Sequence, residues 1–175
     1  MRVMETMNNE NVCVIPGTFD PMTDGHYDII LRAAKIFDKV YVVPFDNSSK
    51  KTMFTYEERR EMLRLAFEEQ GAEKITVDGS NGVLLAEYAK LKGAKFIVKG
   101  IRNIMDTEYE FELFRINKEI GDGIDTMFIP AKSEHLFVSS TFVREMILYN
   151  KDISAYVPVK VKEYINGLLN GGTRK

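Results

Sequence analysis

The sequence predicts an α/β fold in which helices cover both faces of a five-stranded parallel sheet, with further helices at the C-terminus. Two observations lead to this prediction. Five short runs rich in β-branched residues recur along the chain, and each is apolar on consecutive positions, as in strands buried on both faces. Segments with helical periodicity lie between these runs, and such alternation implies right-handed crossovers between parallel strands. The expected architecture is Rossmann-like.

The five predicted strands end in loops that carry polar residues. In a parallel α/β sheet, ligands bind beyond the carboxyl ends of the strands, where the strand order reverses. We therefore expect the functional residues in the loops that follow the strands. The strands are VCVI at 12–15, VYVVPF at 40–45, ITV at 75–77, FIV at 96–98 and MFI at 127–129.

Two helices are predicted before the third strand. The segment 26–37 places apolar residues on one face, which is typical of a helix packed on a sheet. The segment 55–70 opens with a capping box between Thr55 and Glu58, and Gly71 marks its end.

Four helices are predicted in the second half of the chain. One spans 83–92, and another spans 106–120 and opens on Asp106. Helices at about 140–148 and 159–169 follow the last strand. The helix at 106–120 carries an apolar stripe of Tyr109, Leu113, Ile116 and Ile120.

The composition is that of one soluble globular domain. The chain has 175 residues, 45% hydrophobic and 29% charged, with a formal net charge of −2. This balance argues against a general nucleic-acid binder, and no apolar run is long enough to span a membrane. The single cysteine, Cys13, indicates a reducing compartment, so we expect a cytoplasmic protein. Residues 1–10 are predicted to be a flexible tail and residues 11–175 a single domain.

The loop after the first strand reads GTFDPMTDGHYDI from Gly17 to Ile29. Its glycines would let backbone amides approach a ligand, and Thr18 adds a hydroxyl. His26 lies at a helix N-terminus, where free amides favour anions. A tight strand-to-helix turn with His26 as a helix-start residue is the ordinary alternative.

Three further loops carry groups that suit phosphate. Lys50 and Lys51 follow the second strand, although lysine pairs are usually solvated. Lys99 and Arg102 flank Gly100 after the fourth strand. Hydroxyl groups open the helix at about 140, where they could act as caps or bind a triphosphate; they belong to Ser139, Ser140 and Thr141.

These motifs resemble a known family. The stretch PGTFDPMTDGH, with its T-x-G-H core from Thr23 to His26, resembles the signature of the nucleotidyltransferase superfamily. The pieces SKKTMFTYEER, VKGIRN, EYEFEL and FVSSTFVRE are similar to those of phosphopantetheine adenylyltransferases, and the resemblance covers about residues 12–165.

The resemblance implies transfer of an adenylyl group from ATP to 4′-phosphopantetheine, giving dephospho-coenzyme A and pyrophosphate. It implies Mg²⁺ as cofactor and a homohexamer built as a dimer of trimers. His26, Thr18 and Lys50 would be catalytic, and Thr18, Lys50, Leu85 and Lys99 would contact the phosphopantetheine. The ATP site would comprise Thr18, Phe19, His26, Gly100, Ile101, Arg102, Glu110, His135, Leu136, Phe137, Val138, Ser139, Ser140 and Thr141.

Two positions depart from the family pattern. Lys99 stands where many members have arginine, and His135 where many have an aromatic residue. Chemically the reaction needs no general base, because a phosphate monoester with a second pKa of about 6 is mostly dianionic at neutral pH. Two alternatives stay open: a cytidylyltransferase of the same superfamily, and a non-catalytic nucleotide-binding module.

Overall fold

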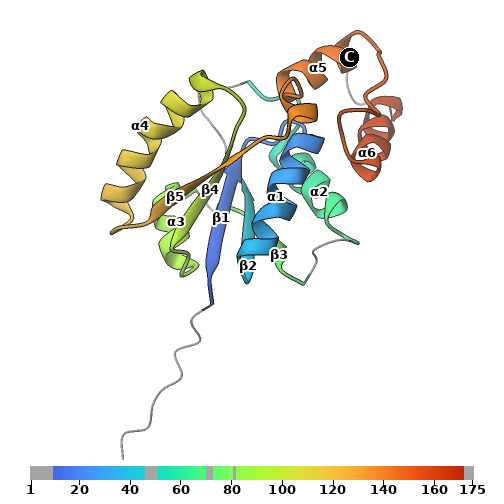
Figure 1. The fold of residues 1–175 in the computed structure, drawn as a ribbon. Coiled ribbons are helices and arrows are strands. Elements are labelled where there is room, and N and C mark those ends of the chain that lie inside the picture. The colour runs from blue at the N-terminus through green and yellow to red at the C-terminus, as the bar shows by residue number, and fades with distance from the viewer. Residues whose placement is uncertain (1–9, 46–50, 70–72, 81, 172–175) are drawn as a thin grey trace, which may run out of the picture.

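A computed structural model describes residues 10–45, 51–69, 73–80 and 82–171 of the chain. Five parallel strands form one sheet in the order β3-β2-β1-β4-β5 (Figure 1). The predicted α/β class and parallel sheet are confirmed. The strands are β1 Val12–Gly17, β2 Lys39–Pro44, β3 Ile75–Val77, β4 Phe96–Ile101 and β5 Asp125–Pro130.

Each predicted helix forms, with small shifts at the ends. The helices are α1 Asp24–Ile36, α2 Tyr56–Ala66, α3 Leu85–Leu91, α4 Ile104–Ile120, α5 Ser140–Leu148 and α6 Val159–Asn170. A short 3-10 turn, Ser133–His135, precedes α5. Every helix among the described residues is too short or too polar to cross a bilayer.

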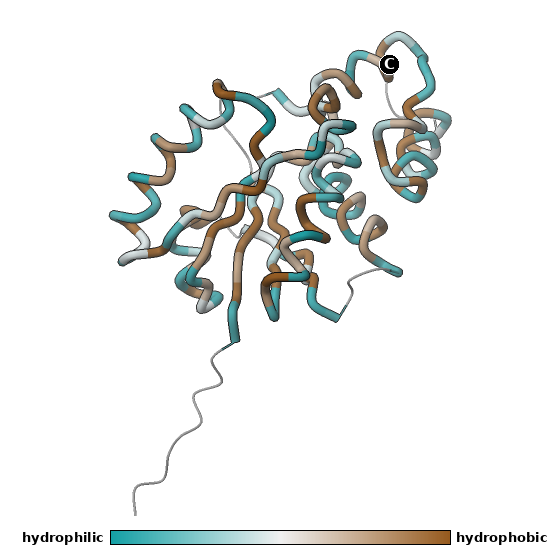
Figure 2. Tube along the Cα trace, viewed as in Figure 1, coloured by the Kyte–Doolittle hydropathy of each residue, from teal (hydrophilic) through white to brown (hydrophobic). Residues whose placement is uncertain are grey.

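Two hydrophobic cores cover the two faces of the sheet. On one face, Cys13 and Ile15 of β1 pack with residues of α1 and α2. On the other face, Val12 and Val14 of the same strand pack with Tyr88 of α3. Successive side chains of a strand point to opposite faces, so a run that is apolar on every position can fill both cores. In Figure 2 the strands are accordingly the most continuously hydrophobic segments.

A third core holds the C-terminal helices against the sheet domain. Val143 and Ile147 of α5 and Val161 and Ile165 of α6 are buried together with Met62 of α2. In Figure 1, α5 and α6 lie beside α2 at the carboxyl-end side of the sheet. The start of α5 is therefore positioned by this core rather than by a strand.

The sheet forks at the point where the strand order reverses. Within the described residues, the register of β1 with β4 covers Cys13–Phe96 and Val14–Ile97. The pairing of β1 with β2 continues to Gly17, and that of β4 with β5 continues to Ile101. The tips of β1 and β4 therefore diverge toward their carboxyl ends, and a ligand site is expected between them.

Two predictions about helix ends need correction. Helix α2 ends at Ala66 rather than near 70, and the predicted stop, Gly71, lies outside the described residues. Helix α4 is capped by Asn103, whose side chain accepts from the backbone N–H of Asp106, so it begins before Asp106. Of the apolar stripe expected on this helix, Ile116 and Ile120 are 53% and 44% exposed.

Candidate active site

The four expected loops converge on one cavity of about 930 Å³ at the carboxyl ends of the strands. The tips of both forked strands line it, through Ile15–Gly17 of β1 and Val98–Gly100 of β4. The predicted site residues that line it are Thr18, Phe19, His26, Leu85, Lys99, Gly100, Arg102, Glu110, His135, Val138, Ser139, Ser140 and Thr141.

Four predicted residues are not found in the described lining of the cavity. Ile101 is in register with Pro130 of β5 and is not in the cavity lining. Leu136 and Phe137 follow the 3-10 turn and point outward, and Phe137 is 88% exposed. Lys50 lies outside the described residues, whereas its neighbour Lys51 lines the cavity.

The turn after β1 is shaped by a close approach of Phe19 to Gly17. Phe19 has a φ of 49°, and a Cβ on Gly17 would lie 2.8 Å from its ring. Only glycine therefore fits at position 17 without moving the ring. The same ring meets His26 edge to face at a centroid distance of 5.1 Å. Phe19 thus forms one wall that holds the imidazole in place.

His26 occupies the third position of α1 and forms a capping box with Thr23. The backbone N–H of Thr23 donates to Nδ1 of His26 over 3.1 Å. Because an N–H can only donate, Nδ1 must be the unprotonated nitrogen of a neutral imidazole. The proton is then on Nε2, which becomes the hydrogen-bond donor of the ring.

The ring is neutral near pH 7. Burial, with a contribution from the positive charge of Arg102, lowers the pKa of His26 from 6.5 to about 4. His26 can therefore donate from Nε2 to a phosphate oxygen without carrying a charge of its own in the ligand-free protein.

Two cations at the carboxyl end of β4 are held by carboxylates of α4. Lys99 Nζ lies 3.1 Å from Glu110 Oε2. Arg102 Nε lies 3.0 Å from Asp106 Oδ2, and Nη2 lies 3.3 Å from Oδ1. Arg102 Nη1 also donates to the carbonyl of Val138 over 3.5 Å, which links the loop after β4 to the loop before α5. Both cations lie where a phosphate group could replace a carboxylate.

The hydroxyl groups at the start of α5 also have structural partners. Ser139 is the N-cap, and its hydroxyl accepts from the backbone N–H of Phe142 over 3.1 Å. The Ser140 hydroxyl donates to the carbonyl of Pro21 over 2.8 Å. The capping interpretation thus holds for Ser139, and Ser140 fixes α5 to the turn after β1. All three hydroxyl-bearing residues still line the cavity.

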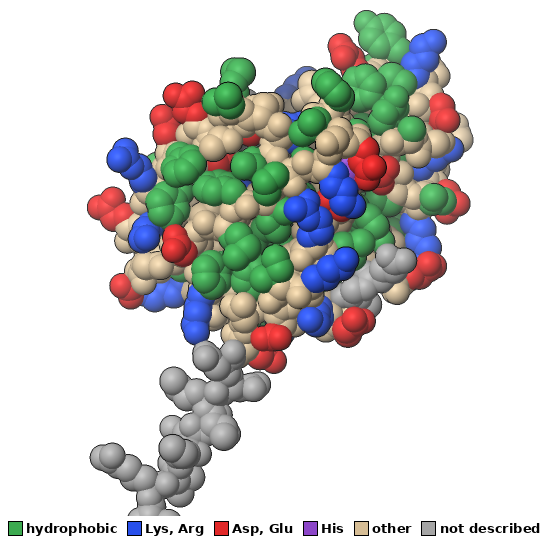
Figure 3. Space-filling model, viewed as in Figure 1, with side chains coloured by type: hydrophobic (Ala, Val, Ile, Leu, Met, Phe, Trp, Pro, Cys, Tyr) green, Lys and Arg blue, Asp and Glu red, His purple; other side chains and the backbone are tan. Residues whose placement is uncertain are grey.

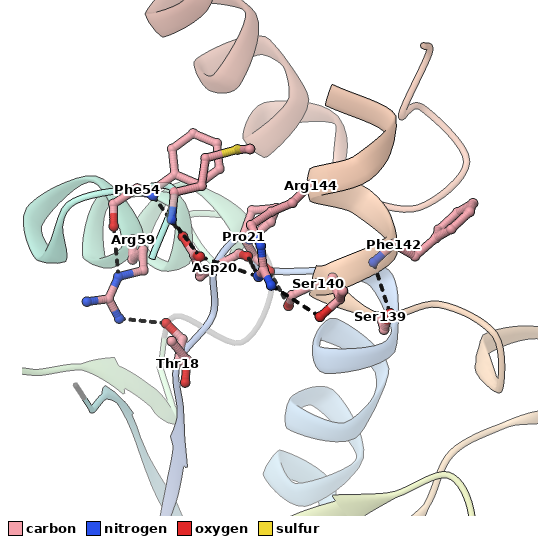
Figure 4. A network of polar contacts seen from close by, with 11 residues as sticks. Thr18, Asp20, Pro21, Phe54, Arg59, Ser139, Ser140, Phe142 and Arg144 are labelled. Atoms are coloured by element: carbon pink, nitrogen blue, oxygen red, sulfur yellow. Dashed lines mark hydrogen bonds and ion pairs between the residues drawn. The ribbon is translucent and has the colours of Figure 1, made fainter. Parts of the chain in front are cut away.

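A network around Asp20 was not predicted from the sequence (Figure 4). Asp20 is 2% exposed, and its carboxylate accepts from the backbone N–H groups of Met53 and Phe54 at 2.8 Å each. Arg144 of α5 donates to the Asp20 carbonyl over 2.6 Å and reaches its carboxylate at 3.4 Å. Buried Arg59 of α2 donates to the Thr18 carbonyl over 2.7 Å.

This network joins the turn after β1, the segment after Lys51 and the start of α5. Asp20 and Arg144 both lie inside motifs that are visible in the sequence, GTFDP and SSTFVRE. Nothing in their spacing of 124 positions indicates that they meet. Arg144 lines the cavity, so it belongs to the site as well as to the hydrogen-bond network that supports it.

The described residues do not form a resident magnesium site. They contain no group of three or more His, Cys, Asp or Glu side chains arranged to hold a metal. The cavity carboxylates Asp106 and Glu110 are engaged with Arg102 and Lys99. Magnesium usually binds through substrate phosphates and few protein ligands, so a role for it stays a prediction attached to the nucleotide.

Comparison with known proteins gives a family and a fold. A family profile described as cytidylyltransferase-like matches residues 14–146. Among solved structures, the chain is similar to a protein from Vibrio parahaemolyticus assigned as a nicotinate-nucleotide adenylyltransferase, with a TM-score of 0.70, 24% identity and coverage of 93% of this chain and 94% of that one.

Two further similar structures come from Plasmodium falciparum. One is a nicotinic acid mononucleotide adenylyltransferase complexed with APC, with a TM-score of 0.67, 16% identity and coverage of 91% of this chain and 96% of that one. The same kind of enzyme complexed with NaAD has a TM-score of 0.66, 17% identity and coverage of 94% and 100%. At these identities the structures establish a shared fold.

Proposed function

This chain belongs to the cytidylyltransferase-like family of nucleotidyltransferases, and on that premise we propose that it transfers AMP from ATP to 4′-phosphopantetheine. The products would be dephospho-coenzyme A and pyrophosphate. The observation that carries the proposal is the convergence of a neutral imidazole donor, His26, with Lys99 and Arg102 on one cavity. The choice of substrates rests on the sequence motifs.

The acceptor phosphate is the nucleophile in the proposed reaction. One of its oxygens forms a bond to the α-phosphorus of ATP, and the bond from that phosphorus to the bridging oxygen of pyrophosphate breaks. Two mutually repelling anions must be brought into line, so positioning and charge neutralisation supply most of the catalysis. Lys99 and Lys50 would hold the acceptor phosphate, and Lys51 would have a smaller role.

His26 would stabilise the charge that develops at the α-phosphate. Its Nε2–H would donate to a non-bridging oxygen, while the Thr23 N–H on Nδ1 fixes the orientation of the ring. Arg102, Arg144 and the start of α5 line the same cavity and would hold the β- and γ-phosphates. Magnesium bound to the triphosphate would neutralise part of its charge.

Apolar side chains in the cavity support a long, weakly polar acceptor. Phe45, Leu85, Met105 and Leu113 line it together with the charged residues. A pantetheine chain offers methyl and methylene groups to such a wall, whereas a nicotinate ring carries a carboxylate that prefers a cation. Nicotinate mononucleotide is nevertheless the second candidate acceptor, because the similar solved structures include enzymes named for it.

A matrix of substrates tests the proposal. The purified protein is incubated with ATP or CTP and with phosphopantetheine or nicotinate mononucleotide. Pyrophosphate release measures turnover, and mass spectrometry identifies the product formed from the acceptor. We expect turnover for ATP with phosphopantetheine, and its loss in His26→Ala. If turnover occurred with nicotinate mononucleotide or with CTP instead, the protein would be assigned that acceptor or that nucleotide. No turnover in any combination would favour a non-catalytic nucleotide-binding module.

We further propose that copies of this chain associate through α4, as expected for a homohexamer. Hydrophobic side chains gather on the side of the molecule where α4 lies (Figure 3). On α4 itself, Ile104, Phe111 and Ile116 are all more than half exposed. A second cavity, lined by Phe111, Phe114 and neighbouring residues, lies along the same helix. Exposed apolar surface of this kind is typical of subunit interfaces. A cytoplasmic location remains part of the proposal.

A further inference from the structure

Lys99 and Glu110 form an ion pair at the place where the proposed function needs a free cation. Lys99 Nζ lies 3.1 Å from Oε2 and 3.2 Å from Oε1 of Glu110, so both carboxylate oxygens contact the ammonium group. The two side chains are 16% and 17% exposed, and both residues line the cavity. The carboxylate therefore occupies Lys99 as a bound anion would.

The arrangement is repeated one helical turn away. Arg102 is held by Asp106, and Asp106 and Glu110 are four positions apart on α4, which places them on one face of the helix. Both cations at the carboxyl end of β4 thus meet a carboxylate of the same helix in the ligand-free protein. The Arg102 pair is more exposed, at 36% and 26%, so the Lys99 pair is the better shielded of the two.

We propose that Glu110 is a built-in competitor for Lys99, which keeps weakly binding anions out of the site until a phosphate monoester displaces it. The inference rests on the proposed function, because that function assigns the acceptor phosphate to Lys99. It adds a role for Glu110 that is separate from any contact with the nucleotide.

Charge explains why only some anions can displace the carboxylate. A singly charged anion that displaces Glu110 brings Lys99 no more negative charge than the carboxylate does. The free anion also loses translational freedom when it binds, a cost that Glu110 avoids because it is part of the protein. A phosphate monoester is mostly doubly charged near pH 7 and has three oxygens that can accept hydrogen bonds. The phosphate monoester therefore interacts more strongly with the Lys99 ammonium group than the Glu110 carboxylate does. The doubly charged monoester is also the species that can attack the α-phosphorus.

The test uses two small probes and no nucleotide. Methyl phosphate is a monoester and mostly a dianion at about pH 7.5, because its second pKa is about 6, whereas dimethyl phosphate is a monoanion. Each probe is titrated into the full-length protein at constant ionic strength, and binding is followed by the chemical shift of the Gly100 amide. The variants are Lys99→Met, Glu110→Gln and Glu110→Asp, with Glu110→Ala as a second variant if Glu110→Gln does not fold.

The two partners of the ion pair should act in opposite directions. We expect Lys99→Met to weaken methyl phosphate binding and Glu110→Gln to tighten it by about tenfold, as expected when a charge-assisted competitor is removed. Dimethyl phosphate should bind measurably to Glu110→Gln but not to the wild-type protein. Glu110→Asp keeps the competing charge and should resemble the wild type. Glu112→Gln is the matched control, because it removes the same charge from an exposed position of α4.

Three results would overturn the inference. Weaker binding in both partner variants would mean that the pair only supports the shape of the site. Equal affinities in Glu110→Gln and Glu112→Gln would mean that Glu110 does not compete. Unchanged binding in Lys99→Met would remove the phosphate from Lys99 and reject that part of the proposed function too. Opposite shifts without turnover on any substrate would instead support the competitor role and count against the proposed reaction alone.

Discussion

The backbone N–H of Thr23 donates to Nδ1 of His26 over 3.1 Å, and this bond decides which ring nitrogen carries the proton. Burial lowers the pKa of His26, so the ring is neutral and carries a single N–H proton. That proton lies on Nε2. The helix start that holds the histidine therefore also sets its chemistry. One capping box does both.

Removing the imidazole should affect turnover far more than ATP binding. We expect His26→Ala to lower kcat by ~10²-fold or more, the typical effect of losing one preorganised donor to a developing charge. The second histidine, His135, also lines the cavity and supplies a matched control, since His135→Ala should cost much less. Similar losses of kcat in the two variants, measured by pyrophosphate release, would contradict the role of His26.

The partly buried, neutral side chain of His26 should make the protein less stable in mild acid. The pKa of His26 is about 4 in the folded protein and 6.5 for a histidine exposed to water, so between these values the unfolded chain binds more protons. The stabilising contribution is complete above pH 6.5 and is lost as the pH falls toward 4. We expect a loss of about 2 kcal/mol between pH 7 and pH 5 from this group.

Urea unfolding of the wild type and of His26→Gln at both pH values measures this contribution. The variant lacks the titrating ring, so the free energy of unfolding should fall less between pH 7 and pH 5 than in the wild type. An equal fall in both proteins would show that other groups cause the acid sensitivity.

The neighbouring lysines should differ in their effect on the reaction. We expect Lys50→Ala to lower kcat and raise the KM for the acceptor strongly, because the resemblance places Lys50 between the two substrates. Lys51 lines the cavity but is exposed, so Lys51→Ala should have a smaller effect. Steady-state kinetics with each substrate varied in turn distinguishes the two. Equal and mild effects would mean that both lysines are simply solvated.

The buried carboxylate of Asp20 should be important for stability. The Asp20 carboxylate accepts hydrogen bonds from N–H groups of Met53, Phe54 and Arg144. In Asp20→Asn, the side-chain NH₂ group would face at least one of these donors, and that hydrogen bond would be lost. We expect a loss of about 3 kcal/mol in the free energy of unfolding, as for other broken buried pairs. Asp122→Asn is the control, because its ion pair with Lys90 is exposed and should contribute less than about 0.5 kcal/mol. Urea unfolding measures the free energy of unfolding of both variants. A loss in Asp20→Asn as small as that in Asp122→Asn would contradict the stabilising role of the Asp20 carboxylate.

The proposed subunit contact on α4 can be tested with one charge. We expect Ile116→Glu to reduce the mass of the assembly in light scattering, because a carboxylate would be buried at the interface. Leu148→Glu is a matched change on α5, where the side chain is 70% exposed. It should leave the assembly intact. The opposite pattern would place the contact on α5 instead.

The strands and helices were predictable because their signals are local. Consecutive apolar residues at 12–15 specify a strand with two buried faces, and the Thr55–Glu58 capping box was found from spacing alone. The start of α4 was missed because two side chains compete for it. Asn103 caps the helix, which leaves the Asp106 carboxylate to pair with Arg102. The apolar stripe of α4 did not reveal that Ile116 is exposed, because periodicity alone does not distinguish a buried apolar face from an exposed one.

The site was predictable in part for a similar reason. Parallel strands bring their following loops to one edge, so His26, Lys99 and Arg102 could be expected to meet. The contacts of Asp20 with Arg144 could not, because they depend on how α5 packs through the third core rather than on strand order. The capping role of Ser139 could be expected from its place at a helix start, whereas the Glu110 partner of Lys99 could not, since a sequence shows that a polar group is present but not what it already binds.

The fork in the sheet gives the ligand a mechanical role. Beyond Val14 and Ile97, β1 and β4 continue as the ends of two separate ladders, one shared with β2 and one with β5. A nucleotide that contacts both tips would connect the two strands beyond their last paired residues. Binding should then slow amide hydrogen exchange along β1 and β4 well behind the cavity, because opening the paired part of these strands would also require the ligand to leave.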